Sequence, residues 1–254
     1  MIEIIKINTC FKLHKKWLYI LVAILCVSCS NKIINPANFK TTEQVELGGI
    51  GVASNFVLDK SYEQTGIVTY KQPIKVAVQQ ETFNNTTYKA FEKAKFTSNK
   101  KTTIVYIDSV DTKPNYLKLE IADRISIIEA VNDTKNTSVK AFLKVKHEAH
   151  LVSQVSIAFP KQIQTSILSA DEIYLQSYGV NSFAIHLYKK GVLTDTIPFT
   201  EGVVFSYGGS KFCWKNTNHS VWEIADIVPT NKTCPKGTYR SPKKDKSLNQ
   251  HLRF

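Results

Sequence analysis

The feature that most constrains this chain is a basic segment followed by an apolar run near its start. Three lysines and a histidine lie between positions 12 and 16, and an uncharged, mostly apolar run extends from Trp17 to Val27. This run has the length of the hydrophobic region of a secretory signal peptide. It is shorter than the roughly 20 residues that a membrane-spanning helix needs. We therefore expect an export signal that delivers the rest of the chain to an oxidising compartment.

The run ends in Cys26-Val27-Ser28-Cys29, followed by Ser30. This stretch resembles the lipobox of a bacterial lipoprotein, and its Ser-Cys-Ser core is similar to the looser version in Bacteroidota lipoproteins. Ser28 and Cys29 match the pattern, whereas Cys26 stands where an aliphatic residue is usual. The resemblance implies that residues 1–28 are removed and that Cys29 is lipidated, with residues 29–43 as a lipidated N-terminus and linker. The alternative is an ordinary cleavable signal or an uncleaved anchor.

The resemblance also implies an address. Cys29 is followed by Ser30, Asn31 and Lys32. These residues contain no acidic cluster of the kind that resembles a surface-transport signal in Bacteroidota lipoproteins. Position 30 also lacks the aspartate that would resemble an inner-membrane retention signal. We therefore expect a protein that is lipid-anchored to the outer membrane and faces the periplasm rather than the cell surface.

Length and charge limit what the exported part can be. Removal of the first 28 residues leaves 226 of the 254, enough for one domain with a core of its own. The removed segment carries four lysines and one glutamate, so its loss lowers the formal net charge from +12 to +9. Such a basic surface attracts anionic lipid or acidic glycan. We expect no nucleic-acid partner, because the basic residues do not interleave with aromatic stacking residues.

The cysteines predict one covalent link. Cys10 and Cys26 leave with the signal and Cys29 takes the lipid, so only Cys213 and Cys234 remain. An even pair in an oxidising compartment predicts one disulfide. A reactive thiol or a zinc-binding pair is the alternative, although the spacing is not that of a zinc knuckle.

Hydrophobic periodicity predicts an α+β fold. We expect a mainly antiparallel sheet with three or four short helices and a C-terminal β-meander stapled by the disulfide, all within one domain at 44–239. Strands are expected at 44–54, 67–70, 73–83, 102–110, 116–121, 151–159, 173–178, 182–188, 193–199, 203–207, 211–214 and 221–228. Helices are expected to begin near Asn85, Asp123, Asn136 and Pro160. Residues 240–254 are polar and basic without periodicity, which predicts a disordered tail.

The sequence contains weak candidates for chemistry. His147-Glu148-Ala149-His150 is the densest group of potential metal ligands, and histidines three apart share one face of a helix. The group lies between a predicted helix and a predicted strand, so we expect neither a metal nor another cofactor. The stretch 206–210 lacks the Gly-x-Ser-x-Gly order of a nucleophile elbow, and Gly208-Gly209 predicts a turn.

Aromatic residues gather near the cysteine pair. Tyr207, Trp214 and Trp222 are candidates for contact with a partner protein or a glycan, and packing around the disulfide is the alternative. We expect a non-enzymatic outer-membrane lipoprotein that is an accessory or structural subunit of a cell-envelope assembly. A glycan-binding lipoprotein is the first alternative. An envelope hydrolase whose site comes together only in the fold is the second.

Overall fold

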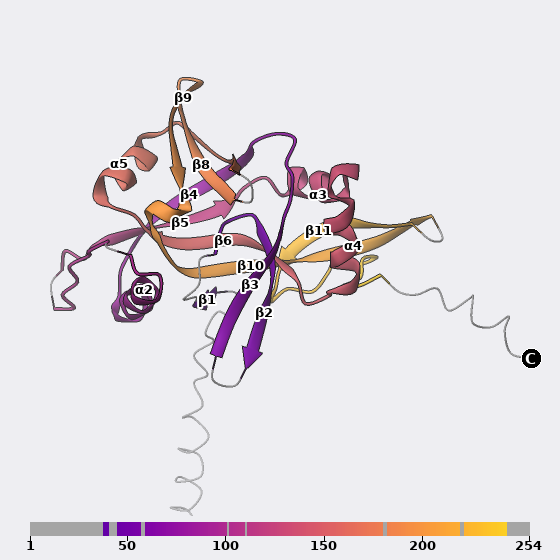
Figure 1. Ribbon diagram of the computed structural model, residues 1–254, viewed down its shortest axis with the longest axis horizontal. Coiled ribbons are helices and arrows are strands. Elements are labelled where there is room, and N and C mark those ends of the chain that lie inside the picture. Colours follow the sequence, from indigo (N-terminus) through magenta and orange to yellow (C-terminus); the bar gives the residue numbers. More distant parts are fainter. Residues whose placement is uncertain are drawn as a thin grey trace, which may run out of the picture. The chain divides into compact units, whose positions relative to one another are not determined.

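Antiparallel strands dominate the structure (Figure 1). The computed structural model describes residues 38–40, 45–56, 59–100, 102–109, 111–179, 182–218 and 221–242. The strands are β1 (Asn38–Lys40), β2 (Gly49–Phe56), β3 (Asp59–Ile67), β4 (Ile74–Thr82), β5 (Asn115–Ile121), β6 (His150–Ala158), β7 (Glu172–Tyr178), β8 (Ser182–Lys189), β9 (Val192–Pro198), β10 (Val203–Asn218) and β11 (Val221–Pro229). The helices are α2 (Asn85–Thr97), α3 (Arg124–Asn132), α4 (Thr137–Val145) and α5 (Lys161–Ser169), with 3-10 turns η1 (Thr134–Asn136) and η2 (Phe199–Glu201).

The strand order explains how the sheet is built. The path runs β1-β10-β6-β5-β4 and continues from β4 into the meander β7-β8-β9 (Figure 1). β11 pairs with β10, and β2 pairs with β3 and β6. β4 links the two parts, because Val76–Thr82 pairs with β5 whereas Ile74 and Lys75 pair with β7. Every strand pair in the described residues is antiparallel. The α+β prediction is confirmed.

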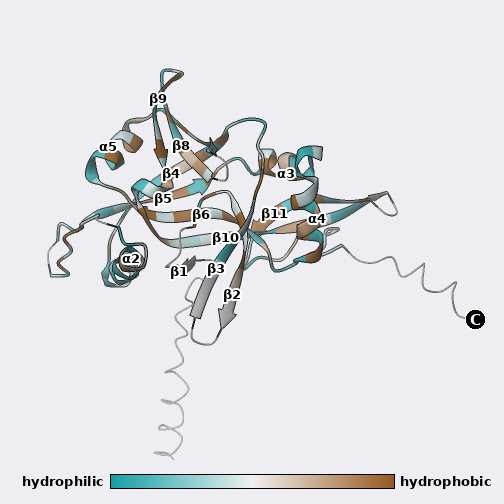
Figure 2. Cartoon of the chain, in the orientation of Figure 1, coloured by the Kyte–Doolittle hydropathy of each residue, from teal (hydrophilic) through white to brown (hydrophobic). Residues whose placement is uncertain are grey.

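One face of the sheet packs against the main hydrophobic core. Side chains alternate along a strand, and Figure 2 shows apolar segments on the central strands. Leu117 and Leu119 of β5 share this core with Leu175 of the meander, Ile127 of α3 and Ile167 of α5. The meander and the helices α3, α4 and α5 therefore cover this face.

Helix α2 covers one end of the opposite face. Phe83, Phe91 and Phe205 pack there with Tyr116, and the Phe83 and Tyr116 ring centroids lie 4.8 Å apart. Asn84 caps the helix by accepting a hydrogen bond from the backbone N–H of the third helical residue. The cap is one residue before the predicted position. No residue of this helix lines the other end of the face.

Three predicted elements were wrong for physical reasons. The predicted strand at 67–70 is not one, because β3 ends at Ile67 and the backbone N–H and carbonyl of Thr69 bond the Asn136 amide instead of a neighbouring strand. The predicted inner strand at 102–110 is not a strand in its described residues, because no neighbouring strand pairs with it and Val105 is 75% exposed. The predicted turn at Gly208-Gly209 does not exist, because β10 runs straight through it. Gly209 is needed there for space: a Cβ atom would lie only 2.5 Å from the His150 ring.

The ends of the chain are partly outside the description. The predicted signal at 1–28, the lipidated Cys29 and the tail from residue 243 lie outside the described residues. Three residues of the predicted linker, Asn38–Lys40, form β1 and pair with Ser206–Gly208 of β10. Among the described helices, none has both the length and the apolar character required to cross a membrane.

Candidate functional site

A polar pocket of about 500 Å³ lies at the end of the sheet face that α2 does not line. A single row of side chains crosses four strands there. Ala77 of β4 pairs with Glu120 of β5, Glu120 pairs with Gln154 of β6, and Gln154 pairs with Gly208 of β10. The small residues at both ends of the row leave room above the sheet. The carboxylate and amide between them are the polar groups of the pocket floor.

A strand irregularity adds two hydroxyl groups. Gly208 pairs with Gln154, but Gly209 pairs with Val152, so Ser153 has no partner in the ladder. Such a bulge redirects a side chain. The Ser153 Oγ lies 2.7 Å from the Ser210 Oγ and donates to the carbonyl of Gly208 at 3.3 Å. Both serines line the pocket, and Ser210 is buried.

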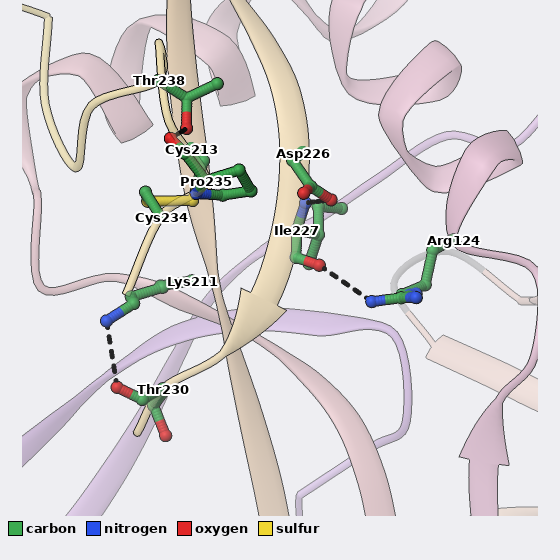
Figure 3. Close-up of a disulfide and its surroundings, with 9 residues drawn as sticks. All are labelled: Arg124, Lys211, Cys213, Asp226, Ile227, Thr230, Cys234, Pro235 and Thr238. Atoms are coloured by element: carbon green, nitrogen blue, oxygen red, sulfur yellow. Dashed lines mark hydrogen bonds between the residues drawn. A yellow bond between two sulfur atoms is a disulfide. The ribbon is translucent and has the colours of Figure 1, made fainter. Parts of the chain in front are cut away.

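The start of α3 places a cation at the pocket. Asp123 caps the helix, as predicted, and hydrogen bonds donated by Ser126 hold the Asp123 pKa below its usual range. Arg124 is the next residue, and its Nη1 donates to the carbonyl of Ile227 at 3.3 Å (Figure 3). Among the described residues, no ion pair within 4.0 Å joins Arg124 to Glu120. Both side chains are exposed, so a ligand can reach both charges.

The predicted disulfide is confirmed. Cys213 and Cys234 are bonded, with their Cα atoms 5.6 Å apart (Figure 3). The bond joins β10 to the segment that follows β11. That segment also meets β10 at Trp214, whose backbone N–H and carbonyl both pair with Tyr239 at 2.7 Å. The disulfide and this bridge together hold the C-terminal segment against the sheet.

The predicted aromatic contacts are mostly interior. Tyr207 is 2% exposed and Trp214 is 1% exposed, so the structure argues against contact of either residue with a partner or glycan. Trp222 is half-buried and meets Tyr239 edge-on at 5.9 Å. Packing beside the disulfide, the alternative interpretation, describes Trp214 and Trp222.

The two histidines do not form a shared site. His147 is exposed in a turn, whereas His150 is 3% exposed at the start of β6 and stacks on Tyr207 with ring centroids 5.9 Å apart. Burial lowers the His150 pKa, and the charge of Arg240 acts in the same direction. In the described part of the chain, no three histidine, cysteine, aspartate or glutamate residues form a group that could hold a metal ion.

No protein-family model, curated protein or solved structure matches this chain. The chemistry of the pocket must therefore be inferred from its own residues. Sequence patterns placed Glu120 on the polar side of a strand and Arg124 just after a helix cap, but nothing in the sequence brought them together. In the described residues, neither Ser153 nor Ser210 has a histidine or carboxylate as hydrogen-bond partner. The pocket is equipped to bind polar groups.

Proposed function

We propose that this chain is a non-enzymatic lipoprotein of a Bacteroidota-type outer membrane and an accessory subunit of a cell-envelope assembly. One observation carries the proposal: β1 pairs with the strand that forms the pocket floor, with Asn38 opposite Gly208. Asn38 is nine residues after Cys29, a span of at most about 30 Å. A partner bound in the pocket would be held close to the lipid anchor.

The disulfide and the charge support the same location. A disulfide is typical of proteins in oxidising compartments, including the bacterial periplasm. The excess of lysine and arginine over acidic residues favours contact with anionic lipid headgroups. We infer that the domain works at the membrane surface and faces the periplasm.

Metabolic labelling tests the anchor. Cells that express the full-length protein are grown with labelled palmitate, and the wild type is compared with Cys29→Ala and Cys26→Ala. We expect the label to be lost only in Cys29→Ala, because Cys26 leaves with the signal. Label that persists in Cys29→Ala would refute the lipoprotein assignment.

Affinity capture tests the subunit role. The tagged full-length protein is recovered from membranes dissolved in mild detergent, beside two variants that each place arginine at an exposed alanine. Ala77→Arg fills the pocket, whereas Ala141→Arg lies on α4. We expect the wild type and Ala141→Arg to recover envelope proteins in stoichiometric amounts and Ala77→Arg to lose them. Recovery of none by the wild type contradicts the subunit role, and equal recovery by all three contradicts the pocket as the contact.

A glycan-binding role is the second candidate, and the outer face of the meander supports it. Tyr174 and Tyr178 lie on the same face of β7, opposite the buried Ile173 and Leu175. The centroids of the Tyr174 ring and the Tyr188 ring on β8 are 5.5 Å apart. Tyr178 is 46% exposed. Aromatic faces of this kind can stack on sugar rings. On a glycan array we expect Tyr178→Ala to abolish binding and Trp222→Ala to retain it. If instead Trp222→Ala abolished binding and Tyr178→Ala retained it, the glycan site would lie near the disulfide.

A further inference from the structure

We propose that the pocket binds a short zwitterionic peptide, with its carboxylate at Arg124 and its ammonium group at Glu120. The inference rests on the proposed function only in taking this pocket as the contact site. It adds the chemical class of the ligand. The two charged side chains lie on one pocket and do not neutralise each other within 4.0 Å in the described residues.

Arg124 is suited to a carboxylate. Its guanidinium is planar and carries five N–H donors, of which one is used by the carbonyl of Ile227. That single bond orients the group without satisfying it. The remaining donors can form paired hydrogen bonds with the two oxygens of a carboxylate.

The other polar groups are suited to an ammonium ion. When Ser153 donates to the carbonyl of Gly208, Ser210 donates to Ser153, and both hydroxyl hydrogens are used. The pair then offers only oxygen lone pairs to the pocket. Together with the carboxylate of Glu120, these oxygens accept hydrogen bonds, and an ammonium group is purely a donor.

The size and lining of the pocket fit a peptide between the two charges. About 500 Å³ is within the range of small-ligand sites. The rest of the lining is small or apolar: Ala77, Ile121, Ala122, Leu151, Gly208, Gly209, Ile227 and Pro229. Such a surface can accept short side chains.

Three probes test the charges separately. Binding to the full-length protein in detergent micelles is measured by calorimetry for tri-alanine, acetyl-tri-alanine and tri-alanine amide. Acetylation removes the ammonium group, and amidation removes the carboxylate. We expect tri-alanine to bind saturably and each blocked form to bind about five-fold more weakly, the effect of about 1 kcal/mol from one partly solvated ion pair.

Variants assign each charge to its residue. We expect Arg124→Gln to bind tri-alanine and its amide equally, and Glu120→Gln to bind tri-alanine and its acetyl form equally. Lys118→Gln is the matched control, because Lys118 is also on β5 but pairs with Glu81 at 3.7 Å and does not line the pocket. It should keep both preferences. Circular dichroism of each variant verifies the fold.

The outcomes separate the two proposals. No saturable binding of tri-alanine at millimolar concentration, or equal affinity for all three probes, overturns the ligand assignment. The ligand assignment is also overturned if Arg124→Gln and Glu120→Gln both keep the preference for tri-alanine over its amide and its acetyl form. If envelope partners are still captured through the pocket in that case, the subunit role stands. If tri-alanine binds as expected but the wild type captures no partner, only the subunit role fails.

Discussion

Removal of the disulfide should weaken the fold by a predictable amount. The perturbation is the double variant Cys213→Ala and Cys234→Ser, in which alanine replaces the fully buried cysteine and serine the partly exposed one. The bond closes a loop with a sequence separation of 21 residues. On the chain-entropy model, closing a loop of that length costs the unfolded chain entropy worth about 3 kcal/mol at 25 °C. Urea denaturation followed by tryptophan fluorescence measures the loss.

The same variant should loosen one part of the structure first. After β11 the segment touches β10 through the Trp214–Tyr239 bridge and the disulfide. Without the bond, the segment keeps the two hydrogen bonds of the bridge and, at its start, the hydrogen bonds of Thr230 with Gly209 and Lys211. We expect hydrogen exchange at the Trp214 and Tyr239 amides to accelerate in the variant while amides in β5 stay protected. Wild type treated with reductant should behave as the variant does.

Two results would refute this reasoning. A loss of unfolding free energy below about 1 kcal/mol would mean that the unfolded chain gains little freedom when the bond is absent. Unchanged exchange at Trp214 would mean that packing of its buried ring, rather than the disulfide, holds the bridge. Either result would show that the disulfide does not hold this end of the sheet together.

Three further perturbations test other contacts. Gly209→Ala should destabilise the fold by about 1–3 kcal/mol in urea, because its Cβ would overlap the His150 ring, whereas Gly66→Ala, with no atom within 4 Å, should change stability by less than about 1 kcal/mol. Burial lowers the His150 pKa from its value of 6.5, so the unfolded chain takes up a proton first as the pH falls, and stability should drop between pH 7.5 and 5.5. His150→Phe should reduce that drop in thermal melts, and a similar change at exposed His147 should not. Asn136→Ala should cost about 3 kcal/mol, because the buried amide bonds the N–H and carbonyl of Thr69 and the carbonyl of Ala130 at 2.8–2.9 Å; a loss under about 1 kcal/mol would contradict this.

Local patterns predicted the regular elements well. Alternation located β5 and β8, and in the turn that joins β8 to β9 Lys190 and Gly191 have φ values of 50° and 76°. These signals depend on neighbours in the sequence. The turn predicted at Gly208-Gly209 was wrong because Gly209 makes room for the ring of His150, which lies on another strand and which no local pattern contains.

The pocket could not be predicted for the same reason. Its floor needs the register of four strands, and its hydroxyl pair needs a one-residue shift opposite Gly208. Asn136 shows the same limit. The sequence predicted a helix cap, and the residue does stand before α4, but its side chain makes no cap bond and instead links two distant backbone segments. Contacts with residues far away in the sequence decide what such a side chain does.

The shortness of β1 has a mechanical consequence. If Cys29 is held in a membrane, any pull on the domain enters the sheet through three residue pairs between β1 and β10. Those pairs are the first to separate under load, and their separation would add the three residues 38–40 to the tether, about 10 Å of extra reach. The disulfide-bonded strand behind them would stay folded. The tether would then have two lengths: a short one while β1 is paired with β10, and a longer one when a partner that moves away pulls β1 off the sheet.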